Sequence, residues 1–492
     1  MHKPWIHGVA YTFGIAVVVA LLVAPVPQLI EARDRANKAD LAASTNIVQN
    51  LAAGTSAETV DIDGRLLTVR RVAGRLAVPV RERHVQATSG SIVADYPEPA
   101  CLVVNVDQTT TIAIGTDEAL IPASVQKVLT AIAALDVIGA ETRFSTDVVA
   151  DTVPDDDGVL DGDLRVIGGG DPMLAERRYA DAYRRQPQLL TDIAQLVDAI
   201  VDSGVRRVRG DLLVDDSRYD TVRYVESWPE RYVEQHNSGP IGALTVNDGF
   251  IQWEPTRVEA DDPAIYFGQV LTGLLAEAGV FVEGRLLRGV AAPGVPIATV
   301  ESAPVGEIVQ QMLRESDNNT AESLLKEIGY RTSERGETSA GAEVVKTVVS
   351  ERGIDVSDLV IVDGSGLDRG NRVACATLAA LLDQEGPDSI LGQGLAVAAE
   401  SGTLGHRFVD TDVAGRLHAK TGLLNNVNAL TGFAETLDGN TVTFAQLLNG
   451  IPLNSRLGIE LQEDLAAQLV EVTVGASLDE LMTGAGLSDD DR

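Results

Sequence analysis

The sequence is poor in cysteine, histidine and basic residues. Its 492 residues include two cysteines and six scattered histidines, so no metal site of the Cys/His type is expected. The 39 Lys and Arg are outnumbered by 72 Asp and Glu, which gives a formal net charge of −33. Nucleic-acid binding requires a basic surface, so nucleic acid is not expected as a partner. The three glycines at 168–170 lack the spacing of a dinucleotide-binding loop, and no cofactor is expected.

The two cysteines, Cys101 and Cys375, carry little information by their position. Cys101 opens an apolar, strand-like run, and Cys375 lies in a helix-like stretch. Export from the cytoplasm would permit a disulfide, but two cysteines so far apart in sequence do not define one. We therefore expect both to be small buried residues rather than a bridged pair.

A long uncharged run occupies residues 9–23, near the N-terminus. Such a run fits both the core of a signal peptide and a membrane anchor. Because Pro25 follows Ala24 and no clean cleavage site is evident, we expect an uncleaved membrane helix within residues 1–30. Secretion after cleavage of residues 1–24 is the alternative. Both place the rest of the chain outside the cytoplasm, at the extracytoplasmic face of the membrane or in the cell wall.

Hydrophobic patterning divides the chain that follows. Residues 31–87 are mixed and polar, which is typical of a stalk or linker. Two β-branched runs then flank Asp107 and Gln108 and predict a β-hairpin. Apolar residues at helical spacing follow over 121–139 (IPASVQKVLTAIAALDVIG) and predict a long helix.

The hydrophobic patterning of residues 147–476 predicts a domain that is split by an insertion. From 147 to 295, short strands alternate with Asp/Gly turns, which indicates one or two inserted domains. Two helices, several antiparallel strands and a last amphipathic helix come after this segment. Helices at both ends around antiparallel strands suggest an α+β domain formed by 88–146 and 296–476. Residues 477–492 are expected to be an acidic, solvated tail.

Two side chains on the predicted long helix have the spacing needed for nucleophilic chemistry. Ser124 and Lys127 are three residues apart, so they share one face of the helix at its first turn. A lysine whose pKa is lowered by burial and by neighbouring cations can accept the proton of a serine hydroxyl. An isolated S-x-x-K is more often a capping serine with a solvated lysine, so further motifs decide the interpretation.

Two such motifs occur later in the chain. The triplet Ser-Asp-Asn at 316–318 interrupts two apolar helices, where a turn would project Ser316 and Asn318 into a cleft. The triplet Lys-Thr-Gly at 420–422 lies on a predicted strand, where Gly422 would let a ligand backbone approach closely. Alone, the first could be a helix cap and the second a surface lysine before a turn. The ordered set S-x-x-K, S-D-N and K-T-G is that of penicillin-binding proteins and class A β-lactamases.

With these motifs the chain resembles the class C low-molecular-mass penicillin-binding proteins, the D-alanyl-D-alanine carboxypeptidase/endopeptidase family. The long separation of Ser124 from Ser316 favours this family over the β-lactamases. The resemblance implies a penicillin-recognising domain of the serine transpeptidase/β-lactamase type, an antiparallel sheet flanked by helices and split by a large, mixed β-rich insertion. The stretches that carry it are PASVQKVLT, GGGDPML, ALTVND, SDNNTAESLLKEIG, DGSGLDRGNR, SGTLGHRF and AKTGLLNNVNALTGF.

The resemblance also implies catalytic roles. Ser124 would attack the carbonyl of the penultimate D-Ala, with Lys127 as the general base. Ser316 would relay a proton to the leaving amine, and Asn318 would bind the substrate backbone. Lys420 would supply positive potential and help to keep Lys127 neutral.

Binding roles follow in the same way. Thr421 would meet the terminal carboxylate, and Gly422 would lie beside the substrate. The backbone N–H groups of Ser124 and Leu423 would form the oxyanion hole. Many relatives have a hydroxyl residue where Leu423 stands, so carboxylate binding is expected to be weaker here.

These roles predict a serine-type D-alanyl-D-alanine carboxypeptidase, with DD-endopeptidase activity as a further expectation. The expected partners are peptidoglycan peptides ending in D-Ala-D-Ala, β-lactams as covalent inhibitors, and the membrane through the N-terminal segment. Two alternatives stay open. One is a β-lactamase-like hydrolase or esterase on the same scaffold, against which the insertion argues. The other is a non-catalytic cell-wall binding protein, against which the complete motif set argues.

Overall fold

The computed structural model describes residues 96–471 apart from 107, 117, 184 and 453–454. The expected N-terminal membrane helix, the stalk and the acidic tail lie outside the described residues. Within the described part of the chain, no helix is both long and apolar enough to cross a membrane.

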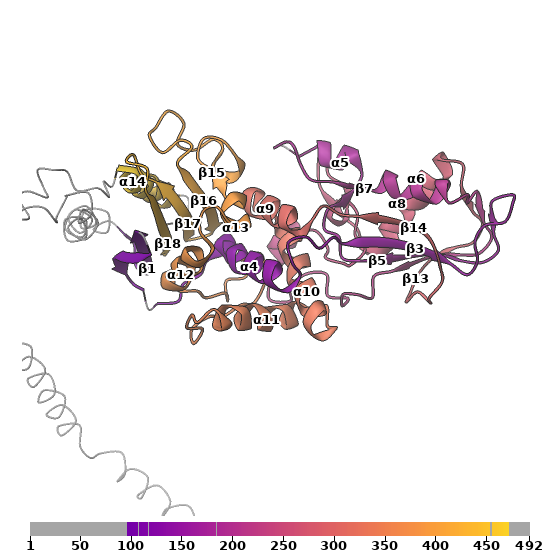
Figure 1. The fold of residues 1–492 in the computed structure, drawn as a ribbon, viewed down its shortest axis with the longest axis horizontal. Helices are drawn as coiled ribbons and strands as arrows, with labels where there is room; N and C mark the ends of the chain where they lie inside the picture. Colours follow the sequence, from indigo (N-terminus) through magenta and orange to yellow (C-terminus); the bar gives the residue numbers. More distant parts are fainter. Residues whose placement is uncertain (1–95, 107, 117, 184, 453–454, 472–492) are drawn as a thin grey trace, which may run out of the picture. The chain divides into compact units, whose positions relative to one another are not determined.

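A six-stranded antiparallel sheet joins strands from both ends of the described chain (Figure 1). In order across the sheet they are β15 (Ala396–Val397), β16 (Leu417–Leu424), β17 (Val427–Glu435), β18 (Thr441–Asn449), β1 (Ala100–Val106) and β2 (Thr109–Ile114). The predicted hairpin is confirmed as β1 and β2. The predicted late strands are confirmed as β16, β17 and β18. β18 pairs with β1 and so joins these strands to the N-terminal hairpin.

Helices pack on both faces of this sheet. Because side chains alternate along a strand, Phe433 and Leu447 belong to one core while Leu430 and Phe444 belong to another. The first core contains α4 (Lys127–Val137), α9 (Val305–Glu315), α10 (Asn318–Ser333), α11 (Thr338–Glu351), α12 (Cys375–Glu385) and α13 (Ile390–Gly394). The second contains α14 (Leu457–Glu471). Between them, the cores fix the sheet relative to the helices that carry the site.

The chain between α4 and α9, residues 145–301, forms a second sheet; we call it the intervening segment. Across this sheet the strands are β13 (Leu286–Arg288), β9 (Leu212–Asp215), β5 (Leu164–Gly168), β3 (Ser145–Ala150) and β14 (Val295–Glu301). β5, β9 and β13 pair in parallel because α6 (Ile193–Asp202) and α8 (Pro263–Glu277) form the crossovers between them. Both helices and the sheet share a hydrophobic core of their own.

Shorter elements complete the intervening segment and supply several residues of the site described below. They are β4 (Val159–Leu160), β6 (Leu174–Ala175), α5 (Arg177–Asp181), β7 (Thr191–Asp192), β8 (Arg207–Val208), α7 (Glu230–Glu234), η2 (Asn247–Gly249), β10 (Phe250–Gln252), β11 (Val258–Glu259) and β12 (Phe281–Val282).

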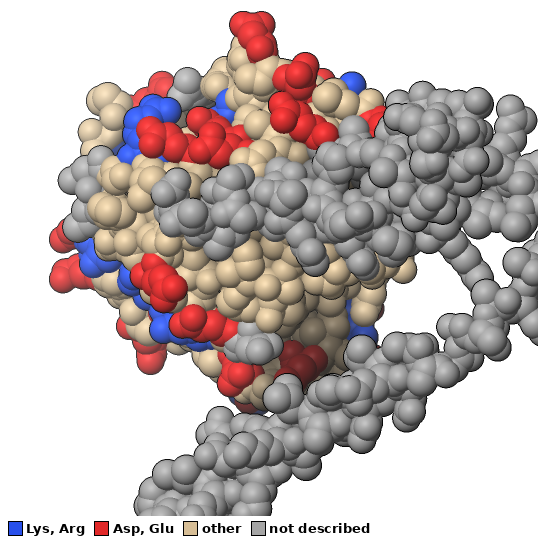
Figure 2. All heavy atoms as spheres, turned by 90° about the vertical axis from the view of Figure 1, so that its left-hand side faces the viewer, with Lys and Arg blue, Asp and Glu red and all other residues tan. Residues whose placement is uncertain are grey.

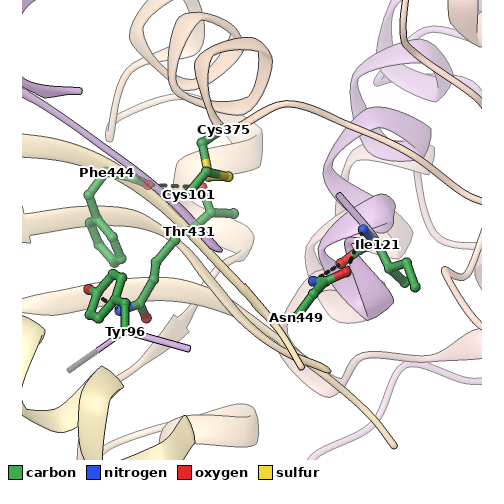
Figure 3. Close-up of a disulfide and its surroundings, with 8 residues drawn as sticks. Tyr96, Cys101, Ile121, Cys375, Thr431, Phe444 and Asn449 are labelled. Carbon is green, nitrogen blue, oxygen red and sulfur yellow. Dashed lines mark hydrogen bonds between the residues drawn. A yellow bond between two sulfur atoms is a disulfide. The ribbon is translucent and has the colours of Figure 1, made fainter. Parts of the chain in front are cut away.

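A disulfide joins Cys101 on β1 to Cys375 at the start of α12 (Figure 3). Their Cα atoms lie 5.9 Å apart, and both side chains are fully buried. The expectation of two unpaired cysteines was therefore wrong. The two residues are separated by 274 positions, and they become neighbours only because α12 packs against β1 in the folded chain.

Charged side chains of both signs lie interspersed on the face shown in Figure 2. Ion pairs at the surface include Arg416 with Glu435 at 3.0 Å and Arg456 with Glu460 at 3.9 Å. Exposed pairs of this kind contribute only about 0–1 kcal/mol each. We therefore attribute the stability of this part of the fold mainly to its two cores and the disulfide.

Removing the disulfide should destabilise the protein measurably. We expect Cys101→Ala with Cys375→Ala to lower the free energy of unfolding by about 2–5 kcal/mol, because the cross-link restricts the unfolded chain over a long separation. Guanidinium unfolding followed by tryptophan fluorescence measures the difference. A reductant should destabilise the wild type and leave the double variant unchanged. Equal stability of oxidised and fully reduced wild type would contradict this contribution.

Candidate active site

Ser124 lies on a short 3-10 helix, η1 (Ala123–Gln126), that runs directly into α4. We expected Ser124 on the first turn of the α-helix, whereas the α-helix begins at Lys127. The chain enters η1 through Ala123 at a left-handed φ of 48°, a backbone strain that surrounding contacts must hold in place. Ser124 is partly exposed and Lys127 is fully buried. The turn therefore presents the hydroxyl at the surface and the amine to the interior.

Two contacts hold this turn against the sheet. The side chain of Asn449 accepts from the Ile121 N–H at 3.0 Å and donates to the Ile121 C=O at 3.1 Å (Figure 3). On β16, a Cβ at Gly422 would come within 2.7 Å of the Pro122 carbonyl oxygen. We expected Gly422 to make room for a ligand. The missing side chain makes room for the turn that carries Ser124, because β16 packs directly against η1, and the approach of a ligand stays a prediction.

The Ser-Asp-Asn triplet forms the predicted break between two helices. Ser316 ends α9 at a left-handed φ of 63°, and Asp317 caps α10 by accepting from the Thr320 N–H at 2.9 Å. Asn318 is the first residue of α10, and its Nδ2 donates to the Asn237 C=O at 2.6 Å. This contact with the intervening segment orients the Asn318 amide, so that its oxygen faces the Lys127 amine.

The Lys-Thr-Gly triplet lies on β16, as predicted. Lys420 Nζ donates to Ser316 Oγ at 2.8 Å and to the Thr421 C=O at 2.8 Å. Thr421 Oγ1 donates to Thr403 Oγ1 at 2.9 Å. The side chain of Leu423 is 67% exposed. The strand is therefore joined directly to the break between α9 and α10, and Leu423 extends into solvent beside it.

Beyond Ala419, the outer edge of β16 has no strand partner among the described residues, because β15 pairs with β16 over two residues only. Next to these two paired residues of β15, the Ala398 N–H donates to the Leu417 C=O at 2.9 Å. Backbone groups alternate between the two sides of a strand. The N–H and C=O groups of Thr421 and Leu423 therefore point to the same open edge as those of Leu417. Such an edge can accept an extended peptide as an additional strand.

The Lys127 amine connects the motifs. Its Nζ lies 2.7 Å from Asn318 Oδ1, 2.6 Å from the Ser365 carbonyl oxygen and 3.2 Å from Ser124 Oγ. The amide and carbonyl oxygens can only accept hydrogen bonds. In a neutral amine they take both N–H groups, which leaves the lone pair for the Ser124 hydroxyl. This arrangement can transfer a proton from Ser124 to Lys127.

Burial lowers the pKa of Lys127 from 10.5 to about 8. Asp363, Glu322 and Asp317 oppose this effect, since their negative charges favour the protonated amine. The neutral base is therefore a minor form of about a tenth at pH 7, far more than at the ordinary pKa of 10.5, and becomes half of the population near pH 8.

Burial lowers the pKa of Lys420 well below its ordinary value, and the charges of Lys127 and Arg185 lower it further. We expected Lys420 to be the cation that keeps Lys127 neutral. Burial is the main cause of the lowered pKa of Lys420, while carboxylates near Lys127 favour its protonated form, and the role expected for Lys420 stays a prediction. A bound carboxylate would reverse this by stabilising the protonated form of Lys420.

A cavity of about 520 Å³ adjoins the site on the side of Ser316 and Asn318. The intervening segment supplies much of its wall, including Tyr179, Tyr183, Arg185, Phe250, Trp253 and Arg257. Aromatic faces and charged groups thus lie together next to the triplet. In the part of the chain that the structure describes, no cluster of His, Cys, Asp and Glu has the arrangement of a metal site.

Three parts of the site were missed from the sequence: the Ser365 carbonyl oxygen, the Glu322 carboxylate and the Thr403 hydroxyl. All three lie in or beside stretches that carried the family resemblance, DGSGLDRGNR, SDNNTAESLLKEIG and SGTLGHRF. That resemblance was the available signal. It could not indicate which atoms face Lys127, because any residue type can supply a carbonyl oxygen.

Comparison with known proteins agrees with this geometry. The chain matches the D-Ala-D-Ala carboxypeptidase 3 (S13) family over residues 90–261 and 253–473. It is 30% identical over 438 residues to a D-alanyl-D-alanine carboxypeptidase of Actinomadura sp. (strain R39), covering 72% of this chain and 77% of the relative. It is 32% identical over 370 residues to carboxypeptidase DacB of Mycolicibacterium smegmatis, covering 72% and 76%.

The fold also matches a solved structure, penicillin-binding protein 4 (dacB) from Haemophilus influenzae. The TM-score is 0.68 at 21% identity, and the match covers 77% of this chain and 99% of that one. The expected penicillin-recognising fold is therefore confirmed for the described residues. With the family match over most of its length, the chain belongs to the D-Ala-D-Ala carboxypeptidase (S13) family of serine peptidases.

Proposed function

We propose that Ser124 is the nucleophile with which this carboxypeptidase cleaves the terminal D-Ala–D-Ala bond of peptidoglycan stem peptides. The observation that supports this most directly is the Lys127 amine, whose two strong acceptors leave its lone pair for the Ser124 hydroxyl. A serine hydroxyl is a weak nucleophile unless a base of this kind removes its proton.

In the acylation step, Lys127 accepts the Ser124 proton while Oγ attacks the carbonyl carbon of the penultimate D-Ala. The backbone N–H groups of Ser124 and Leu423 stabilise the oxyanion that forms. The open edge of β16 supports this role for Leu423, since its N–H points outward. Removal of one oxyanion donor typically costs about 10²–10³ in rate.

Collapse of the tetrahedral intermediate breaks the peptide bond and requires a proton on the leaving amine. Ser316 relays to the amine of the terminal D-Ala the proton that Lys127 took from Ser124, directly or by way of Lys420, so that Lys127 is neutral again. The 2.8 Å contact between Lys420 Nζ and Ser316 Oγ supports the relay. Water then attacks the acyl carbon and Lys127 takes its proton. As the bond between the acyl carbon and Ser124 Oγ breaks, Lys127 returns this proton to Oγ, and the shortened peptide leaves.

The substrate lies as an added strand along β16. Thr421 binds the terminal carboxylate with Lys420 beside it, Gly422 keeps the strand close to the nucleophile turn, and Asn318 contacts the substrate backbone. A β-lactam acylates Ser124 in the same way. The amine released when its ring opens stays attached to the acyl group, so hydrolysis of this adduct is slow.

The enzyme works at the extracytoplasmic face of the membrane, held by the N-terminal segment or released after its cleavage. The uncharged run over residues 9–23 supports this placement. The buried disulfide supports it too, because disulfides persist mainly in oxidising compartments. Protease added to intact, wall-stripped cells should digest the catalytic part, and full protection would contradict this placement.

Replacement of the nucleophile should abolish acylation. We expect wild type to take up one equivalent of a fluorescent penicillin and Ser124→Ala to take up none, as measured by intact-protein mass and denaturing gels. Ser350→Ala, at an exposed position on α11, is the matched control and should label fully. An unlabelled wild type would refute the proposed function. Rapid loss of the label with turnover would favour the β-lactamase alternative.

Leu423 should limit recognition of the free carboxylate. We expect Leu423→Thr to raise kcat/KM about tenfold for a peptide ending in D-Ala-D-Ala, the equivalent of one hydrogen bond to a charged group, about 1.5 kcal/mol. The same peptide with an amidated C-terminus should gain much less. Leu437→Thr, at another exposed leucine, is the control. An equal gain for both peptides would show that position 423 does not read the carboxylate.

A further inference from the structure

The loop Asp363–Asn371 (DGSGLDRGN) lies behind the catalytic lysine, and none of its side chains takes part in the steps above. Asp363, Ser365 and Asn371 are fully buried, although all three are polar. Buried polar groups are costly unless every one of them is hydrogen-bonded. Their partners therefore indicate what this loop holds in place.

The loop contacts η1 and the first turn of α4 at three points. The Ser365 C=O accepts from Lys127 Nζ at 2.6 Å, and the Gly364 C=O accepts from Thr130 Oγ1 at 2.8 Å. Gly366, at a φ of +83°, lies so close to η1 that a Cβ there would be 1.8 Å from the Ala123 carbonyl oxygen. The loop backbone is thus in direct contact with the turn that carries Ser124 and Lys127.

Glu322 holds this loop from the side of α10. It lies one turn after Asn318 on the same helix face. Its Oε1 accepts from the Gly364 N–H at 3.1 Å and from the Ser365 N–H at 2.7 Å. One face of α10 therefore places both acceptors of the Lys127 amine, Asn318 directly and the Ser365 carbonyl through the loop backbone.

Asp363 holds the loop from the other side. Its Oδ1 accepts from the Gly366 N–H at 2.8 Å and the Asn371 amide at 2.7 Å. Its Oδ2 accepts from the Asp368 N–H at 2.6 Å and from Trp228 Nε1 at 2.8 Å. Three of these donors belong to the loop itself. Trp228 belongs to the intervening segment and packs against Leu367 of the loop.

We propose that Glu322 and Trp228 are positioning residues for the general base. Glu322 aims the Ser365 carbonyl oxygen at the Lys127 amine, and Trp228 couples the intervening segment to the same loop through Asp363. The inference deepens the proposed function and rests on it. It gives the intervening segment a part in nucleophile activation in addition to its part in the cavity wall.

The charge of Glu322 provides a readout that a merely structural role would not affect. The ionisable groups that face Lys127 are Asp317, Glu322 and Asp363, with Lys420 on β16. Burial raises the pKa of Glu322 to about 7, so it is largely anionic where Lys127 titrates, near pH 8. The negative charge of Glu322 favours the protonated form of Lys127, so its removal should lower the pKa of Lys127.

The first test is the pH profile of acylation by a fluorescent penicillin. In wild type, the rate should rise with pH to a plateau, with a midpoint near 8. Glu322→Gln keeps an acceptor for the loop N–H groups but removes the charge, and should move this midpoint down by roughly one pH unit. Asp171→Asn, at a buried carboxylate that accepts from the Met173 N–H, is the control and should not move it. An unmoved midpoint in Glu322→Gln would overturn the role of Glu322.

The second test isolates the contact from the intervening segment. Trp228→Phe removes the N–H donor and keeps an aromatic ring, and should slow acylation about tenfold through misplacement of the base. The dissociation constant of the initial penicillin complex should stay within twofold. Tyr232→Phe is the matched control, because Tyr232 belongs to the same buried cluster and makes no hydrogen bond to Asp363.

The final labelled fraction separates positioning from misfolding. A positioning defect leaves every Trp228→Phe molecule able to label, but slowly, whereas a folding defect lowers the labelled fraction at an unchanged rate. Wild-type kinetics in Trp228→Phe, or only a lowered labelled fraction, would overturn the coupling and leave the proposed function intact. Failure of wild type itself to label would instead remove the proposed function, and this inference with it.

Discussion

The Lys127 side chain ends in a fully buried amine, and most of the site is arranged around the needs of that group. A buried amine has to be given hydrogen-bond acceptors, or the cost of removing it from water is too high. The amide oxygen of Asn318 and the carbonyl oxygen of Ser365 meet this need. Since they use the N–H groups of the neutral amine, the remaining lone pair is left for the Ser124 hydroxyl.

This requirement explains why distant segments converge. Asn318 is oriented by a carbonyl of the intervening segment. Ser365 is oriented by Glu322 and by the hydrogen bond from the Gly366 N–H to Asp363 within its own loop. The turn that carries Ser124 is held by Asn449 and packs against Gly422. Each support comes from a different element, so the position of the amine depends on the packing of both cores and of the intervening segment.

Electrostatics within the site is a balance rather than a single effect. Burial alone would make both lysines poor cations, while three carboxylates restore part of the basicity of Lys127. Lys420 has no such compensation and has two cations near it. The site therefore holds one lysine whose pKa lies near 8 and a second whose pKa is lowered by burial and by nearby cations.

The periodicity of the sequence was sufficient to predict the local structure. The β1–β2 hairpin, the helix after Ser124, the break at Ser316 and the strand with Lys420 all follow from short-range spacing, and the structure contains each of them. Local preferences of the backbone set these features, so a single sequence is enough. Short-range spacing was a poorer guide where a neighbour came from elsewhere, as with Gly422, which packs against the turn that carries Ser124.

The sequence by itself determined which side chains are available for chemistry: a serine and a lysine one helical turn apart, and two triplets able to complete them. The tertiary structure alone decided which atoms meet. It paired Cys101 with Cys375 across 274 positions, and it placed the Ser365 carbonyl oxygen on the Lys127 amine. Contacts of this kind have no signature in one sequence, because a backbone oxygen belongs to every residue and its direction is set by the packing of segments far apart in the chain.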